Sequence, residues 1–350
     1  MRLGWRGTLG IALSLILLWV TLRGVNLAEV WGILSASSIP LWIACMVTAT
    51  AIFPLRARRW AAILAPLGER VPFAPLWHAT AIGMMVNNVF PARAGEFARA
   101  FALSRERREI PVTTAFASLA VDRLFDGVVV LALMVLATLD PAFPAEATIL
   151  GATAASIAMS AAAFLTIVLV GLYALALAPT LFIAVAEKVV RPIWANGVPK
   201  VRGFLEGFVA GLAVLRAPRL ALEVLGWTVI HWLTNGLAFY FGFLALGIEA
   251  PISAALFIQA LIAIGVAIPS SPGFFGPFEA AGKAGLALYG VPAASAVSWA
   301  IGFHLLSFVP ITVMGAWYFS RVGLHVSDLA GANAKAVNSA VNPAAEKAVP

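Results

Sequence analysis

Three charged residues interrupt an apolar stretch, in the run Asp122-Arg123-Leu124-Phe125-Asp126. Asp122 and Asp126 are four residues apart, and Arg123 is three residues before Asp126, so a helix would place them close enough to form an ion pair. Charges within a membrane-crossing helix are costly and are candidates for a function. Two hypotheses fit the run equally well: the residues bind a substrate, or Arg123 locks against a glutamate elsewhere and holds the fold.

A second polar segment surrounds Pro91, where a moderately apolar stretch breaks off. A helix that restarts after this proline would present free backbone N–H groups and a partial positive charge, which together suit a phosphate. The planar guanidinium group of arginine also matches phosphate oxygens. The candidate binding residues of this segment are Asn87, Asn88, Arg93, Glu96 and Arg99.

A third segment, residues 268–279, reads Ile-Pro-Ser-Ser-Pro-Gly-Phe-Phe-Gly-Pro-Phe-Glu. Gly276 and Pro277 are suited to the N-cap and the first turn of a new helix, with Glu279 in that turn. Ser270 and Ser271 add hydroxyl groups, and we expect both serines and Glu279 to bind the substrate. The alternative is that the prolines and glycines only bend helices, and that the glutamates of both broken segments only cap their own helices.

The run Arg56-Ala57-Arg58-Arg59-Trp60 ends an apolar stretch and either anchors the topology or contacts lipid headgroups through Arg56 and Arg59. The histidines at 78, 231 and 304 have no metal-ligand spacing, so we expect interior, hydrogen-bonded side chains, with groups that line a cavity as the alternative. The single cysteine excludes a cysteine-based metal cluster or an internal disulfide. The sequence predicts no catalytic nucleophile, no metal site and no cofactor site.

The composition excludes a water-soluble domain. Of the 350 residues, 62% are hydrophobic and 11% are charged, whereas about a quarter of the residues of a soluble protein are charged. The formal net charge of +7 does not indicate nucleic-acid binding, because the basic residues lie at the ends of apolar runs, as in membrane proteins that meet anionic lipid. We therefore expect an all-α integral membrane protein.

Six segments are long and apolar enough to be predicted as spanning helices, and they are residues 8–22, 39–53, 113–139, 148–177, 220–246 and 293–319. If the two broken segments are re-entrant hairpins, 20 of the 23 Lys and Arg residues lie on one side. Basic loops identify the cytoplasmic side. The sequence thus predicts a multi-pass protein of a bacterial-type inner membrane with both termini in the cytoplasm.

This topology places the two hairpins in opposite orientations, one in residues 39–139 and the other in residues 220–319. Two such half-repeats with broken helices are a common transporter design, and together they form a membrane domain over residues 1–325. Between them, Phe204, Phe208, Leu212 and Leu215 fall on one predicted helical face, which indicates a helix at the inner interface. We expect residues 326–350 to form a disordered cytoplasmic tail.

The same motifs resemble the flippase-like family typified by the transmembrane part of lysylphosphatidylglycerol synthases. The matching segments are residues 56–60, 87–99, 122–126 and 272–279, which extend across about residues 5–320. The resemblance implies translocation of a lipid, such as an aminoacylated phosphatidylglycerol, between leaflets. The bifunctional synthases carry an aminoacyl-transferase domain after the membrane part, and only about 30 residues follow the last predicted helix here. We therefore do not expect lysyl transfer.

These candidate residues are compatible with three functions. The first is a lipid translocase in which Arg93, Arg99 and Arg123 hold a phosphate while the acidic residues bind a cationic headgroup or carry protons. The second is a membrane-embedded headgroup or glycosyl transferase that uses the carboxylates as acid and base. The third is a non-catalytic partner of a separate lipid-synthesising enzyme. The partner in each case is a membrane phospholipid or another polar lipid, and a homo-oligomer is compatible with all three.

Overall fold

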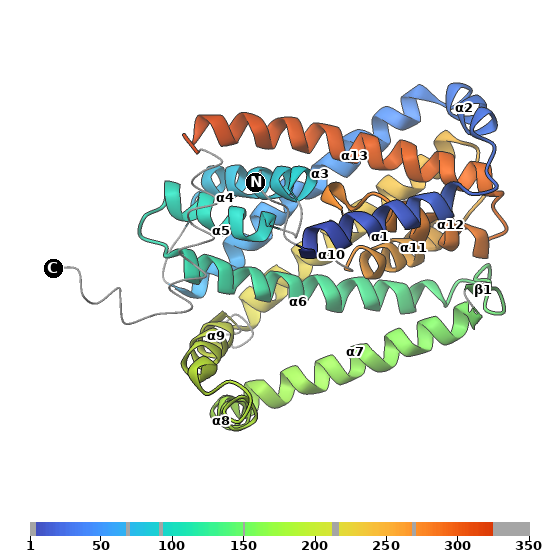
Figure 1. Ribbon diagram of the computed structural model, residues 1–350. Coiled ribbons are helices and arrows are strands. Elements are labelled where there is room, and N and C mark those ends of the chain that lie inside the picture. Colours follow the sequence, from blue (N-terminus) through green and yellow to red (C-terminus); the bar gives the residue numbers. More distant parts are fainter. Residues whose placement is uncertain are drawn as a thin grey trace.

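The computed structural model describes residues 5–67, 71–90, 94–149, 151–211, 217–267 and 271–324. In this part of the chain the fold is helical, with one short antiparallel ladder between β1 (Thr148–Ile149) and β2 (Ala152–Thr153) (Figure 1). The α-helices are α1 (Trp5–Leu22), α2 (Leu27–Ser35), α3 (Ile39–Leu64), α4 (Phe73–Val89), α5 (Gly95–Glu106), α6 (Val112–Ala137), α7 (Ala154–Leu177), α8 (Pro179–Val190), α9 (Val198–Gly211), α10 (Pro218–Ala245), α11 (Ile252–Gly265), α12 (Pro277–Leu288) and α13 (Ala293–Arg321). Three 3-10 turns are η1 (Ala65–Leu67), η2 (Ala195–Gly197) and η4 (Pro272–Phe274).

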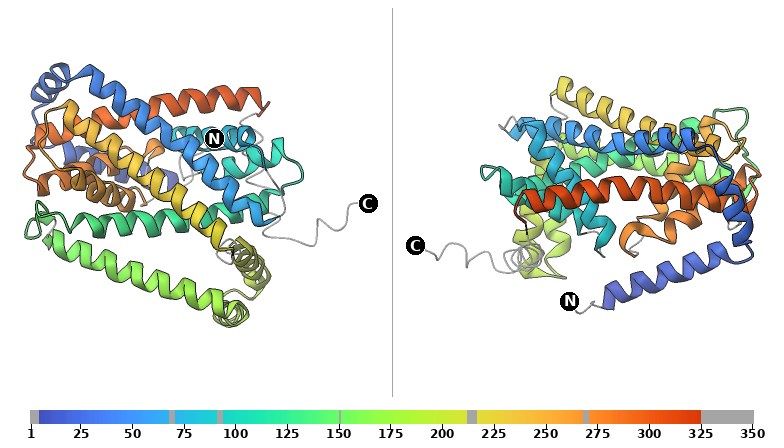
Figure 2. Two further views of the ribbon diagram at one scale, coloured as in Figure 1. Left: turned by 180° about the vertical axis from the view of Figure 1, so that it is seen from behind. Right: turned by 90° about the horizontal axis from the view of Figure 1, so that it is seen from above.

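Two units of four helices, α3–α6 and α10–α13, pack through corresponding partners. Helix α4 of the first unit packs on α13 of the second, and α11 of the second unit packs on α6 of the first. Each unit also contains two consecutive helices that pack on each other, α4 with α5 and α11 with α12. At the centre, α3 lies along α10 in the opposite direction, because the N–H of Ser38 donates to the carbonyl of Ala245 at 2.9 Å while His231 contacts the carbonyl of Ile52 at 3.3 Å. The left view of Figure 2 shows α3 and α10 side by side from behind.

The helices α4 and α5 form an antiparallel pair with very close backbones. The N–H of Gly95 donates to the Oδ1 of Asn87 at 2.9 Å, and at the far end His78 lies 3.0 Å from Glu106. A Cβ added to Gly95 would lie 2.1 Å from the carbonyl oxygen of Gly83. Glycine is therefore required where these two helices meet, because no side chain fits between them.

Replacing Gly95 with alanine is expected to destabilise the fold by about 1–3 kcal/mol, because the new methyl group must push α5 away from α4. The matched control is Gly226→Ala in α10, where an added Cβ meets nothing within 4 Å and helix propensity favours alanine by up to about 1 kcal/mol. Thermal unfolding in detergent measures both. Equal midpoints for the two variants would contradict the close packing.

The second broken segment separates α11 from α12 as the glycine–proline pattern predicts. The expected N-cap is confirmed: Gly276 has φ of 95°, Pro277 begins α12, and the N–H of Gly276 donates to Glu279 at 2.6 Å. A Cβ at Gly276 would lie 2.4 Å from the carbonyl oxygen of Ser14 in α1. Glycine thus supplies both the left-handed backbone and the close approach of α1.

The predicted apolar helices all form, with three differences at their ends. Helix α3 continues to Leu64, and α7 begins only at Ala154 because residues 148–153 form the short ladder. Helices α1 and α2 meet at a bend of 80°. By length and composition, α3, α7 and α13 can cross a membrane, and α1 with α2 can add a fourth span. Large apolar side chains face outward along α7, as a lipid-facing helix requires; they are Met159, Phe164, Ile167, Leu169 and Val170.

Candidate functional site

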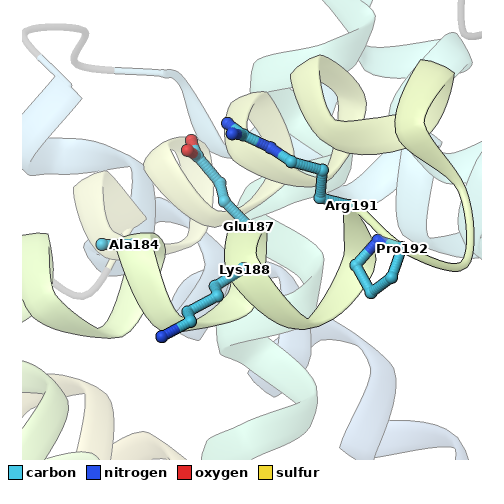
Figure 3. A pocket seen from close by; sticks show the side chains of 5 residues that line it. All are labelled: Ala184, Glu187, Lys188, Arg191 and Pro192. Carbon is cyan, nitrogen blue, oxygen red and sulfur yellow. The ribbon is translucent and has the colours of Figure 1, made fainter.

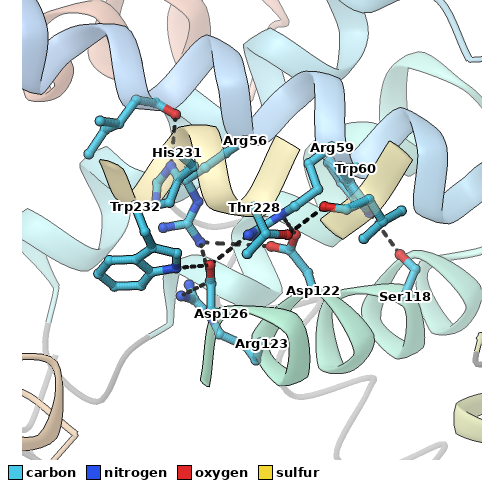
Figure 4. Close-up of polar contacts among 12 residues, drawn as sticks. Arg56, Arg59, Trp60, Ser118, Asp122, Arg123, Asp126, Thr228, His231 and Trp232 are labelled. Atoms are coloured by element: carbon cyan, nitrogen blue, oxygen red, sulfur yellow. Dashed lines mark hydrogen bonds and ion pairs between the residues drawn. The ribbon is translucent and has the colours of Figure 1, made fainter. Parts of the chain in front are cut away.

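Arg59 is the centre of a buried ion cluster between α3 and α6. Its Nε donates to the Oδ1 of Asp122 at 2.7 Å, and its Nη1 donates to the Oδ1 of Asp126 at 2.6 Å (Figure 4). The side chain of Arg59 is 0% exposed, and those of the two aspartates are 0% and 7% exposed. One guanidinium group therefore spans both carboxylates, which is possible because residues four apart share one face of α6.

Two further arginines, one from α5 and one from α6, belong to the cluster. Arg99 of α5 donates to Asp122 at 3.0 Å, and its guanidinium lies over the ring of Trp60, 4.2 Å from the ring centroid. Arg123 of α6 pairs with Glu96 in the first turn of α5 and lies 3.3 Å from Asp126. The cluster thus ties α5 to α6, which agrees with the expected contact of Arg123 with a hairpin glutamate.

Arg56 differs from Arg59 and Arg99 in its distance from the two aspartates, although buried donors without a hydrogen-bond partner among the described residues also occur on Arg59 (Nη2) and Arg99 (Nε and Nη2). It is 7% exposed, and its Nη2 is 3.8 Å and 3.9 Å from the oxygens of Asp122 and Asp126, too far for hydrogen bonds. Its Nε and Nη2 are buried and have no hydrogen-bond partner among the described residues. Buried donors without a partner are rare and require an explanation.

The charges of this cluster do not balance. Four arginines (Arg56, Arg59, Arg99 and Arg123) face three acidic side chains (Glu96, Asp122 and Asp126) in the part of the chain that the structure describes. Among the described residues, the cluster therefore contains one more basic than acidic side chain. An excess of basic groups and buried N–H donors without a partner are features that suit an anion.

A cavity of about 710 Å³ lies between the two units and reaches this cluster. Six predicted site residues line it: Arg56, Asn87, Asn88, Glu96, Arg123 and Asp126. The remainder of the wall is largely apolar and includes four phenylalanines at positions 239, 278, 303 and 308. A polar region within an apolar wall suits an amphipathic ligand, with the polar end held by a few placed groups.

Five predicted site residues do not line this cavity, and they are Arg59, Arg99, Asp122, Ser271 and Glu279. Arg59, Arg99 and Asp122 are buried, and both arginines donate hydrogen bonds to Asp122. Contact of Arg59 with a headgroup, as the sequence suggested, would require breaking both of its aspartate contacts. Arg93 and Ser270 lie outside the described residues. The binding roles themselves stay predictions.

Several groups lining the cavity had no binding role in the sequence-based prediction. The Nε1 of Trp232 donates to Asp126 at 2.9 Å, and the Nδ2 of Asn235 donates to the Oε1 of Gln259 at 3.0 Å. These residues come from α10 and α11, far along the chain from the cluster. The histidines 231 and 304 are buried as expected, and both also line the cavity.

Glu279 and His304 form a second buried contact. It joins α13 to the tip of the α11–α12 pair, here residues 271–279. The Nδ1 of His304 lies 2.5 Å from the Oε1 of Glu279, and its Nε2 lies 2.7 Å from the carbonyl of Gly273. A carbonyl only accepts, so Nε2 of His304 carries a hydrogen and donates it to Gly273.

Replacing His304 with leucine is expected to loosen the tip of this pair. Glu279 is 2% exposed and would lose its only side-chain partner among the described residues, at a local cost of about 1–3 kcal/mol. Hydrogen exchange should therefore become faster in residues 271–279. The matched control is His78→Leu, which removes a half-buried histidine at Glu106 instead. Unchanged exchange in His304→Leu would show that the contact does not hold the tip.

A comparison with known sequences identifies the family of this chain. A model described as the lysylphosphatidylglycerol synthase TM region matches residues 7–315, from α1 into α13. The chain belongs to this family. The resemblance expected from the four motifs is thereby confirmed, and with it a membrane protein.

One curated relative is the protein named "Glycosyltransferase AglD" of Haloferax volcanii, which is 29% identical over 343 residues. The match covers 91% of this chain and 54% of the relative, so the chain spans about half the length of that protein. No solved structure matches the chain.

Proposed function

We propose that this protein moves a lipid with an anionic or aminoacylated headgroup between the leaflets of the inner membrane. The observation that carries the proposal is Arg56: this residue lines the cavity, and its buried Nε and Nη2 have no hydrogen-bond partner among the described residues. A phosphate oxygen supplies the missing acceptor. Glu96 and Asp126 on the same wall would accept a cationic group, such as an aminoacyl amine, next to that phosphate.

The proposed membrane arrangement has six spanning helices, formed by α1, α3, α6, α7, α10 and α13. The pairs α4–α5 and α11–α12 enter as re-entrant hairpins from opposite faces, and the termini lie in the cytoplasm. The antiparallel course of α3 and α10 supports two inverted halves. In such transporters the substrate site lies near the midplane, between the halves, and the cavity is lined by helices of both proposed halves.

Reconstitution into liposomes tests the proposal. Vesicles with fluorescent phosphatidylglycerol in both leaflets are treated with dithionite, which bleaches only the outer leaflet. Protein-containing vesicles should lose more than the outer half of the signal, and protein-free vesicles should not. Aminoacylated phosphatidylglycerol is tested in the same way. If no anionic or aminoacylated lipid moves faster than in protein-free vesicles, the proposed function is wrong.

A second candidate is a role in glycosyl or headgroup transfer, because the relative from Haloferax volcanii is named a glycosyltransferase. The chain would then act on a membrane-embedded lipid itself or hold that lipid for a separate lipid-synthesising enzyme. Incubation with lipid extract and activated sugars, followed by mass spectrometry, separates these cases. A new product with the protein alone favours an enzyme, and a product only with an added soluble enzyme favours the partner role.

A further inference from the structure

Helix α8 has an exposed apolar face that no other described element covers. Four exposed large apolar residues of this helix and one just after its end are between 46% and 83% exposed, and they are Leu181, Phe182, Val185, Val189 and Ile193. The first four lie on one helical face, since they are one, three or four residues apart. The sequence-based prediction had placed an interfacial face at residues 204–215, of which Leu212 and Leu215 lie outside the described residues.

The direction of α8 distinguishes it from a spanning helix. Figure 1 shows α8 nearly end-on, whereas α7 and α6 lie along the picture, so α8 runs across the bundle. Its neighbour α9 packs against α6 and against η1 at the end of α3. The α8–α9 pair therefore lies at one end of the bundle, where α7 ends. A helix in this position lies in the plane of a membrane surface if α7 crosses that membrane.

Charged residues lie beside the apolar face rather than on it. Lys188 and Arg191 line a surface hollow of about 420 Å³ together with Glu187, and Figure 3 shows their side chains projecting from adjacent turns of α8. Glu187 lies 3.3 Å from Arg202 of α9, which leaves the two basic residues as the charges available to a ligand at this hollow. Basic residues beside an apolar face match the headgroups of anionic lipids.

We infer that α8 is a membrane-surface element whose apolar face enters the leaflet at this end of the bundle, while Lys188 and Arg191 bind anionic phospholipid headgroups. Exposed Trp194, at 51%, follows the same helix and is a residue type that prefers the membrane interface. This inference concerns a surface separate from the cavity and does not depend on the proposed transport.

Fluorescence quenching in lipid nanodiscs tests the inference. Cys45, the single cysteine, is buried and is first replaced by alanine, so that one label can be placed by Val185→Cys. The matched control is Ala184→Cys, which lies on the charged side of the same helix. The label at 185 should be quenched by a nitroxide attached near the lipid headgroup and protected from iodide in water. The label at 184 should be quenched by iodide and less by the nitroxide near the headgroup.

The charge requirement is tested with a Lys188→Gln/Arg191→Gln variant in equimolar phosphatidylcholine and phosphatidylglycerol. Nitroxide-labelled phosphatidylglycerol should quench the label at 185 more than labelled phosphatidylcholine, with a preference of about fivefold for each basic residue. The double variant should lose this preference while keeping its unfolding temperature. Iodide quenching at 185 without nitroxide quenching would overturn the inference, as would an unchanged lipid preference in the double variant.

Discussion

Replacing Arg59 with methionine is expected to unfold the protein or to lower its stability by about 3–5 kcal/mol, because two buried carboxylates lose their shared partner. Arg59 has no exposed surface, and its two hydrogen bonds join α3 to α6 at Asp122 and Asp126. The count of charges alone would favour Arg59→Met, because the described cluster has four arginines and three acidic side chains and would lose one positive charge. The loss of Arg59's hydrogen bonds to two buried carboxylates, which among the described residues keep only their bonds to Arg99, Arg123 and Trp232, outweighs that gain.

Two further variants separate charge from geometry at this position. Arg59→Lys keeps the charge but cannot span both carboxylates with a planar fork, so its stability should be intermediate. Arg58→Met on the same helix removes an exposed arginine that stacks on Phe73 and should change stability by less than about 0.5 kcal/mol. Unfolding midpoints and size-exclusion profiles in detergent measure all three. A similar midpoint for Arg59→Met and Arg58→Met would contradict the structural role of the cluster.

Replacing Arg56 with glutamine is expected to give the second large effect, on transport rather than on stability. Arg56 makes no hydrogen bond to the aspartates, so its loss removes little that holds the fold. A charge-assisted hydrogen bond contributes about 1.5–3 kcal/mol, which corresponds to a loss of roughly 10- to 100-fold in transport of phosphatidylglycerol. The rate for an uncharged lipid, if it moves at all, should fall much less.

The control for Arg56 is again Arg58, in the form Arg58→Gln. This variant removes one positive charge from the same end of α3, outside the cavity, and should leave transport unchanged. Both variants should be recovered from detergent in the same amount and with the same unfolding midpoint. If Arg56→Gln transports phosphatidylglycerol at the rate of the unchanged protein, Arg56 does not bind the headgroup.

Local chemistry was the part of this molecule that could be predicted from the sequence. Gly276 and Pro277 specify a helix start because one adopts positive φ and the other lacks an N–H, and α12 begins there. Asp122 and Asp126 share a face because the helical repeat requires it. Each of these features depends on neighbouring residues only, so no knowledge of the packing was needed.

The partners of these residues depend on packing and could not be predicted in the same way. Arg59 is 63 residues from Asp122 in the chain, and no periodic pattern shows that α3 lies against α6. For the same reason an arginine expected to meet headgroups is buried and does not line the cavity, whereas Arg56, three residues earlier, lines it. Trp232 and Gln259 reach the cavity only because α10 and α11 pack on the first unit.

A structure of the protein in nanodiscs of phosphatidylglycerol tests the central claim most directly. The account predicts density for a phosphate in the cavity, with an oxygen within hydrogen-bond distance of the Nε or Nη2 of Arg56 and with Arg59 still bonded to both aspartates. Density for lipid only on the outer surface, with Arg56 turned onto Asp126 and the cavity filled by side chains, would contradict it.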